Sequence, residues 1–369
     1  MAVKKYFLMV FFAALMIAPA LGQGNRPTKE LSQQEREAAY KKGLELDQIP
    51  PGAIELELKY TIPTDKEMEK KEIYFRNVGN FSMDDRGHIY IPDGTLCVVY
   101  ELDAVGKLVH KYDKKGQGPG ELQFPNFVFP YNQQVIVNDG LARRMSFFDR
   151  DWKYVKSFSY FKGGFPFALG SNGLFYSSDR SGDRLISIFN TEGKMIGSFG
   201  ELPYEIRSPL NNFILGVSPA GSIWVGMTAL GKLKRFSSAG SLEVEIDIIE
   251  ISSKLIKNRL IENFQLAKKG VQGHNVLLRA LAFIGEDVLV MNGGIVQPIF
   301  RFDPYGHMKN AYYIQPKMAF FKNYFYVLVG ENGEERFYIL QADHDNGDIC
   351  IGVYGRKKLN HIKFKGGQL

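Results

Sequence analysis

A repeat of about 40 residues is the feature that most constrains the fold of this chain. Six landmark positions, each at the end of a strand-like run, step by 46, 41, 47, 66 and 38 residues. They are Asp103, Asp149, Asn190, Ser237, Asp303 and Gln341. Units of this size with four short strands have the dimensions of one propeller blade, and such units must pack on their neighbours to bury both faces. The sequence therefore predicts an all-β fold, a six-bladed β-propeller with four-stranded blades over residues 53–369.

The second strand of each unit is predicted from a short run of β-branched and aromatic residues. These runs are His88–Ile91, Gln134–Val137, Gly173–Tyr176, Ser222–Val225, Asp287–Val290 and Phe325–Leu328. Before the first unit, Ile54–Ile62 alternates apolar and polar residues, which is typical of a strand with one wet face. We expect this N-terminal strand to close the ring by pairing with the last blade, beside Asp348–Tyr354.

The one long step between landmarks contains a predicted helix. Within Ser252–Gly270, apolar residues recur at intervals of three and four with lysines and glutamates between them. This pattern predicts one helical insertion, residues 252–270, between the fourth and fifth blades. We expect the insertion to roof part of the central channel mouth.

The N-terminus has the pattern of an export signal. Lys4 and Lys5 precede an apolar run from Tyr6 to Ala18, which is too short to span a bilayer comfortably. Residues 1–22 are therefore predicted to be a cleaved signal peptide, leaving no transmembrane segment and an extracytoplasmic protein, either periplasmic or secreted. Removing them takes away two lysines and no acidic residue, so the net charge falls from +6 to +4. No basic block is present, so a nucleic-acid partner is not expected.

Residues 23–52 are predicted to form an N-terminal linker with one short helix. Ser32 and Glu35 form a capping-box pattern, and Pro50-Pro51-Gly52 ends the segment. Two interpretations remain open: a docking arm for a partner, or a linker or helix lying across one face of the body, which we favour.

Two cysteines, Cys97 and Cys350, fall in units that a ring places next to each other. In an oxidising compartment they would be able to form one disulfide. Two buried free thiols are the favoured alternative.

The run Gly116-Gln-Gly-Pro-Gly-Glu-Leu122 is the most specific local pattern. It lacks the Lys-Ser/Thr of a P-loop and no helical pattern follows, so a crossover between blades is predicted, with Glu121 accepting from exposed amides. Nearby, Val137, Asp139, Arg144 and the Phe148-Asp149 end make the segment resemble an NHL repeat. Together, the crossover and this segment resemble bacterial six-bladed β-propeller proteins related to the NHL group, over residues 53–355.

Other acidic patterns receive structural interpretations. The pairs Asp139 with Arg144 and Asp179 with Arg184 recur at matched places, which favours strand-bracing ion pairs over catalytic pairs. Asp343–Asp348 is similar to a calcium loop, but Gly347 stands at a ligand position and Asn346-Gly347 is a strong hairpin turn. No catalytic residue and no metal ligand is assigned.

Candidate ligand-binding residues come from the loops that a propeller places at one mouth of its channel. They are polar residues in or beside predicted crossovers or turns: Asn80, Asn126, Arg143, Arg180, Arg207, Asn212, His274, Arg279 and Asn323. The predicted function is a binding module for a peptide, glycan or partner protein, a monomer without a cofactor. The alternative is a metal-assisted hydrolase or lyase of the lactonase type, with a divalent metal in the channel and Asn126, Asn212 and Asn323 supplying part of its ligands.

Overall fold

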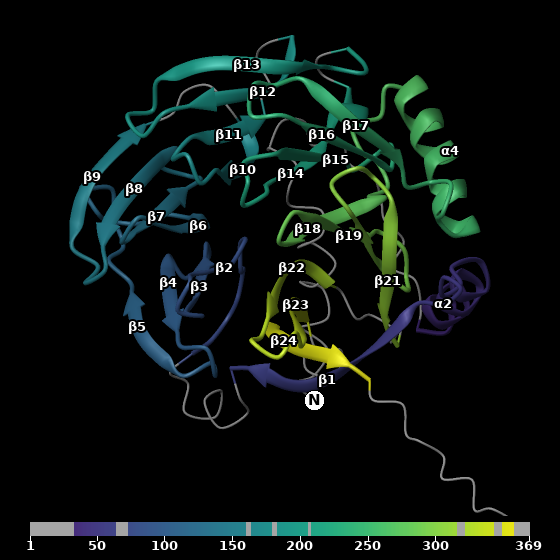
Figure 1. Cartoon of the computed structure of the whole chain (residues 1–369), viewed down its shortest axis with the longest axis horizontal. Coiled ribbons are helices and arrows are strands. Elements are labelled where there is room, and N and C mark those ends of the chain that lie inside the picture. Colours follow the sequence, from purple (N-terminus) through teal and green to yellow (C-terminus); the bar gives the residue numbers. More distant parts are fainter. Residues whose placement is uncertain are drawn as a thin grey trace, which may run out of the picture.

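The computed structural model describes residues 33–63, 73–159, 164–178, 183–205, 208–315, 322–342 and 349–357. These residues form an all-β, propeller-like ring of sheets around a central axis (Figure 1). In the described part of the chain, four sheets have four strands each and a fifth has eight. The prediction of an all-β propeller-like fold is therefore confirmed.

The four-stranded sheets follow one another along the chain, and each is a meander. The first contains β2 (Ser82–Met83), β3 (Ile89–Asp93), β4 (Val98–Leu102) and β5 (Leu108–Tyr112). The second contains β6 (Pro125–Tyr131), β7 (Gln134–Asp139), β8 (Arg144–Asp149) and β9 (Tyr154–Ser159). The third contains β10 (Gly164–Leu169), β11 (Phe175–Ser178), β12 (Arg184–Phe189) and β13 (Met195–Glu201). The fourth contains β14 (Phe213–Val217), β15 (Ile223–Met227), β16 (Lys232–Phe236) and β17 (Leu242–Asp247).

The eight-stranded sheet joins two meanders through the N-terminal strand. Its strands are β18 (Leu278–Ile284), β19 (Asp287–Asn292), β20 (Ile299–Phe302), β21 (Met308–Ile314), β22 (Lys322–Val329), β23 (Glu335–Ala342), β24 (Ile349–Arg356) and β1 (Ile54–Ile62). Strand β1 pairs antiparallel with β24, as predicted, and its first three residues also pair in parallel with Tyr312–Ile314 of β21. Chain segments from opposite ends of the sequence are thus hydrogen-bonded side by side.

In the last meander, the segments occupy different strand positions from those predicted. Phe325–Leu328, expected as a second strand, lies in β22, which is the first strand of that meander. The second strand is β23, which contains the segment around Ile339 that was expected as a third strand. The reason is that β22 and β23 are both rich in aromatic and β-branched residues, so their apolar patterns do not distinguish inner from second strands.

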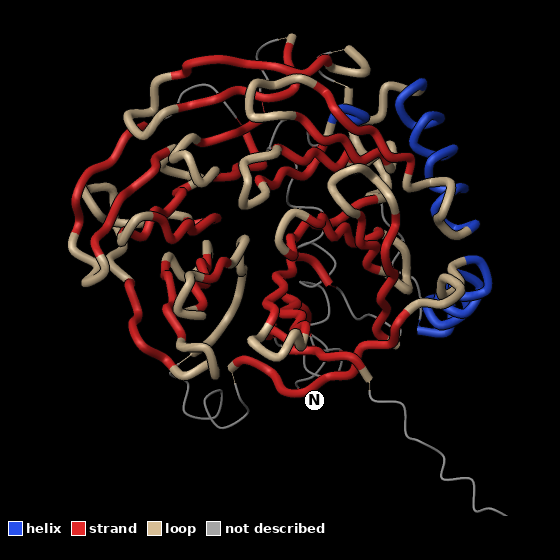
Figure 2. Tube along the Cα trace, viewed as in Figure 1, coloured by secondary structure: helices blue, strands red, loops and turns tan. Residues whose placement is uncertain are grey.

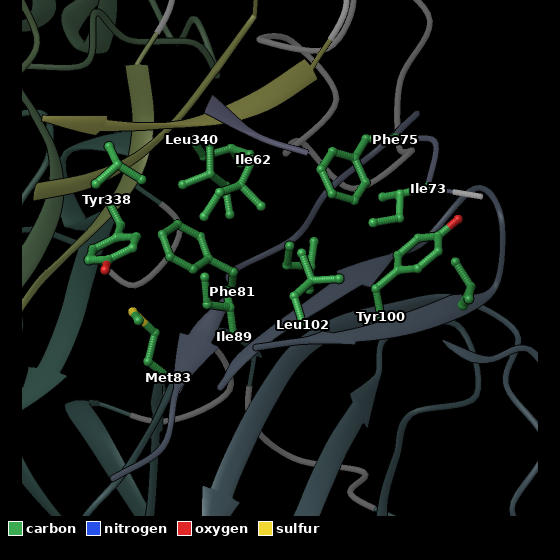
Figure 3. Packing of buried hydrophobic residues seen from close by; sticks show 14 residues of the cluster. Ile62, Ile73, Phe75, Phe81, Met83, Ile89, Tyr100, Leu102, Tyr338 and Leu340 are labelled. Carbon is green, nitrogen blue, oxygen red and sulfur yellow. The ribbon is translucent and has the colours of Figure 1, made fainter. Parts of the chain in front are cut away.

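The core lies between consecutive meanders, where their faces pack together. Second strands such as β3, β15 and β19 are buried along their whole length, while outer strands such as β17 alternate between exposed and half-buried residues. Figure 3 shows the packing between the first meander and the last, where Phe81 and Met83 face Ile62, Tyr338 and Leu340. This contact joins the two ends of the series and completes the ring.

Helix α2 (Gln33–Leu46) and helix α4 (Lys254–Lys268) lie at the rim of the ring (Figure 2). Helix α4, capped by the Ser253 side chain, confirms the predicted insertion, and α2 confirms a helix in the N-terminal segment. The capping residue Ser32 lies outside the described residues. The expectation that the insertion roofs the channel mouth is wrong. Helix α4 lies towards the outer edge, where its Phe264 side chain packs against the cluster that contains Leu210 of the short helix η2 (Pro209–Asn211) and the turn after β15.

The first-to-second and third-to-fourth turns lie on one face of the ring and carry buried ion pairs. Asp84, whose side chain is 2% exposed, accepts hydrogen bonds from Arg150 Nη1 at 2.7 Å and Arg86 Nη2 at 2.9 Å. Arg150 belongs to the next sheet along the chain, so the contact bridges two sheets. Burial opposes ionisation of Asp84, but the hydrogen bonds from Arg150 and Arg86 outweigh it and lower its pKa to about 2.

Replacing Asp84 with Asn should destabilise the ring by about 3 kcal/mol at neutral pH, because two arginines lose a buried acceptor. The stabilisation by an acid with a lowered pKa is complete above its unfolded pKa of about 3.9 and is lost as the pH falls towards the folded value. Urea unfolding between about pH 7 and pH 2 checks both points. Exposed Asp85, the next residue, gives the control Asp85→Asn; equal stability losses in both variants would contradict the account.

Candidate functional site

The second-to-third turns and the crossovers between meanders share the other face of the ring, because strands in a meander alternate in direction. On this face, the residue that follows each of several second strands donates its backbone amide to the crossover that leads into its own sheet. These bonds run from Gly94 to Asn77, Gly140 to Phe124, Thr228 to Asn212 and Gly293 to Leu277, with lengths of 3.0, 2.9, 2.9 and 2.8 Å. The crossovers are therefore held in fixed positions around the mouth of the channel. We call this face the mouth face.

Two aspartates at the ends of second strands reinforce these bonds. Asp139 is fully buried, and its carboxylate accepts from the amides of Gln123, Phe124 and Ala142 at 2.6, 3.0 and 3.0 Å. Asp93 binds the amides of Arg76, Asn77 and Leu96 in the same way. These carboxylates are committed to main-chain donors, so they serve structure rather than catalysis.

The predicted ion pair between Asp139 and Arg144 is wrong. The Arg144 guanidinium donates instead to the carbonyls of Gln117, at 3.1 Å, and Glu121. Instead of pairing with each other, the Asp139 and Arg144 side chains both bind main-chain groups of the crossover. The matching Asp179 of the third meander lies outside the described residues.

The glycine-rich crossover behaves as predicted. The amide of Gly118 donates to Glu121 Oε2 at 2.7 Å, and Gly120 has a φ of +77°, which favours glycine. The Tyr112 hydroxyl donates to the Gly120 carbonyl at 2.7 Å and attaches the loop to the first sheet. The pattern thus forms a braced connection between the first and second sheets.

A polar cluster on the mouth face brings together two predicted site residues. The Asn212 amide lies 3.4 Å from His274 Nδ1, and the Thr228 hydroxyl lies 3.2 Å from His274 Nε2. Asn212 follows η2, Thr228 follows β15, and His274 lies in the loop after α4. We call these three residues the histidine cluster. Burial lowers the pKa of His274, so the imidazole is neutral at pH 7.

Helix α4 holds the loop that carries His274. The buried Asn263 side chain donates to the carbonyls of Ala229 and Asn275 at 2.8 and 2.9 Å, and it accepts from the Asn275 amide at 2.6 Å. One helical residue therefore fixes both the turn after β15 and the residue next to His274. This is the structural role of the insertion at the mouth face.

Two arginines, Arg259 and Arg279, lie close enough to each other for their charges to interact. Arg259 of α4 donates to the Gly293 carbonyl at 2.8 Å, and the Gly293 amide donates to Leu277, two residues before Arg279. Burial and the nearby charge of Arg259 lower the pKa of Arg279 to about 10, so its guanidinium remains protonated at neutral pH. Burial also lowers the pKa of Arg259, whereas the negative charges of Asp47 and Glu262 act to raise it.

The other predicted site residues do not form part of the cluster. The Asn80 amide donates to the Asn126 carbonyl at 2.8 Å, which links two crossovers through their main chains. Arg143 is exposed, with a φ of +48° in the turn after β7. Arg180 and Arg207 lie outside the described residues, as does the side chain of Asn323.

Sequence reasoning missed Thr228, Arg259 and Asn263. Thr228 was open to detection, because it follows a buried strand at the place where Gly94 and Gly140 stand in other sheets, and it brings a polar side chain to that place. Asn263 was hidden within an amphipathic helix, where a buried amide has no sequence signature.

The cysteines and metal candidates are also placed. Cys97 and Cys350 are free and buried, which confirms the favoured interpretation. Among the described residues, no group of three or more His, Cys, Asp or Glu side chains is arranged to hold a metal ion. The segment 343–348, with its similarity to a calcium loop, lies outside them. No helix in the described part of the chain is long and apolar enough to cross a membrane.

Comparisons with known proteins identify the fold. No protein-family model and no curated protein sequence matches the chain. Among solved structures, a Bacteroides fragilis protein described as exported has a TM-score of 0.55 at 12% identity, with coverage of 84% of this chain and 98% of the other. A member of the DUF4221 family from Bacteroides vulgatus has a TM-score of 0.52 at 9% identity (84% and 99% coverage), and a streptogramin B lyase has 0.50 at 13% (83% and 88%). At these identities the similarity establishes the β-propeller fold alone.

The lowered pKa of His274 predicts a pH dependence of stability. As the pH falls through the ordinary histidine pKa of about 6.5, the unfolded chain takes up a proton before the folded chain does. The free energy of unfolding should therefore decrease between about pH 7 and pH 5, by at most about 1.4 kcal/mol per pH unit from this residue. Chemical denaturation of His274→Gln should lack this component.

The matched control is His307→Gln, in a third-to-fourth turn on the opposite face, with a side chain that is 79% exposed. It should retain the His274 component. Identical pH profiles for the original chain and His274→Gln would contradict the assignment.

Proposed function

We propose that this chain is an exported six-bladed β-propeller that binds a peptide, glycan or partner protein at its mouth face. The observation that carries the proposal is the histidine cluster, in which an imidazole, an amide and a hydroxyl converge from three separate connections. Loops held on a rigid ring are where binding residues concentrate in such folds. Export rests on the signal-like pattern of residues 1–22.

The count of six blades treats the eight-stranded sheet as two blades. The contact between its halves is a parallel pairing of only three residues of β1, whereas each half is an antiparallel meander. The halves also pack face to face: Leu289 and Met291 of one share a buried cluster with Phe337 and Ile339 of the other. That is how the four-stranded sheets pack on one another, as in the cluster of Val99 and Val135. The NHL-like segment at residues 137–149 agrees with this count.

The chemistry of the mouth face indicates the kind of ligand. A neutral imidazole, an amide and a hydroxyl suit the hydroxyls and amides of a glycan or a peptide. Arg279, five residues after His274 in the sequence, stays protonated, and its positive charge favours a ligand with an anionic group. We therefore expect an acidic glycan or a peptide with a carboxylate.

Binding to panels of immobilised acidic glycans and peptides tests this proposal. For any ligand found, His274→Ala should weaken binding about tenfold, because a ligand group loses a hydrogen-bond partner in a half-buried site. Arg279→Gln should weaken binding of anionic ligands more than that of their neutral analogues.

The control is His307→Ala on the opposite face, which should bind as the original chain does. The proposal fails if the ligand binds equally well to His274→Ala and Arg279→Gln, or if His307→Ala is equally impaired. Metal-dependent turnover of lactone or ester substrates would instead favour the hydrolase or lyase alternative.

A further inference from the structure

The N-terminal helix α2 is attached to the ring through a small number of residues. Within residues 34–50, Gly43 and Asp47 are buried, and the other side chains that the structure describes are half-buried or exposed. Gly43 lies against the Ile295 side chain, and Asp47, just past the end of the helix, is 2% exposed. The buried contacts between α2 and the ring are therefore concentrated at the C-terminal end of the helix.

The Asp47 carboxylate occupies a ready set of donors. Its Oδ1 accepts from the Ser253 hydroxyl at 2.5 Å, and its Oδ2 accepts from the amide of Val296 at 2.8 Å and from that of Ile295. The charge of Arg259 also acts favourably on Asp47. We call Ser253, Arg259 and the amides of residues 295 and 296 the carboxylate cradle.

Every donor of the cradle belongs to the ring or its insertion, and none belongs to α2. Ser253 caps α4, and Ile295 and Val296 lie in the turn between β19 and β20. The turn is also shaped to admit a carboxylate: a Cβ on Gly294 would lie 2.3 Å from Asp47 Oδ2. All hydrogen-bond donors to Asp47 therefore come from elements other than the helix that Asp47 follows.

We propose that the carboxylate cradle is a binding site for acidic peptide segments, which Asp47 fills in cis, and that α2 is a strap displaced when a partner's carboxylate takes its place. Charge-assisted hydrogen bonds to two amides and a hydroxyl suit a peptide carboxylate, and Asp47 shows the geometry that such a group adopts. The turn at Pro50–Ala53, closed by one backbone hydrogen bond, separates the strap from β1. The site lies at the rim, so this inference goes beyond the histidine cluster and does not depend on it.

Release of the strap can be measured by limited trypsin digestion at Lys41 and Lys42, which are exposed on α2. Two variants of the full chain disrupt the contact between Asp47 and the carboxylate cradle. Asp47→Asn removes the charge of the side chain, and Gly294→Ala places a methyl group in the cradle. Each should speed cleavage about tenfold or more, because hydrogen bonds to a charged group are lost. The control Glu45→Gln removes the same charge from an exposed position two residues away and should leave the rate unchanged.

A thermal unfolding scan of each variant checks that the ring itself remains folded. Should Gly294→Ala unfold, Asp47→Asn still gives the answer, because it alters no residue of the ring. If trypsin cleaves Asp47→Asn at the same rate as the original chain, the proposal that Asp47 holds α2 as a strap is wrong.

Binding in trans tests the site directly. A labelled synthetic peptide spanning residues 33–52 should bind the Asp47→Asn chain, measured by fluorescence anisotropy, and should bind the original chain about tenfold more weakly because Asp47 competes in cis. The same peptide with Asn at position 47 should lose about tenfold in affinity for the Asp47→Asn chain. An unrelated acidic peptide that competes for the site would support a carboxylate-specific cradle. Equal binding of the Asp and Asn peptides, or no binding of either, would overturn the proposal.

Discussion

The pairing of β1 with β24 is the interaction on which the rest of the ring depends. A meander with two apolar faces is stable only when both are covered, so in a ring the first meander must meet the last. Strand β1 brings the start of the described sheets to the end of the chain and places Ile62 in the cluster that Phe81 and Tyr338 share. Hydrogen bonding and apolar packing therefore close the ring at the same point.

Closure also fixes the two faces of the ring. On one face, buried charges such as Asp84 with Arg150 bridge neighbouring sheets. On the mouth face, backbone bonds such as Thr228 to Asn212 hold each crossover to its own sheet. The inserted helix α4 then places His274 through Asn263, while its N-terminus helps to hold Asp47. A single insertion thus supports both the histidine cluster and the carboxylate cradle.

Much of the fold was predictable from the sequence, because period and alternation are local signals. The strand Ile54–Ile62, the helix at residues 254–268 and most second strands are visible as apolar patterns. The strand positions in the last meander were not predictable, since β22 and β23 carry similar apolar runs. The partners of Asp139 were also hidden, because they are main-chain amides that no residue type reveals. His274 and Asn212 were separate candidates, and only the fold brings residues 62 positions apart into contact.

Hydrogen exchange of the backbone amides in β1 and β24 tests ring closure most directly. If β1 pairs with β24 as described, the β1 amides that donate to β24 should exchange as slowly as those of β23, despite their position near the N-terminus. Exchange of the β1 amides at the rate of an exposed loop, with β23 still protected, would contradict the account, because the last sheet would then lack its outer strand.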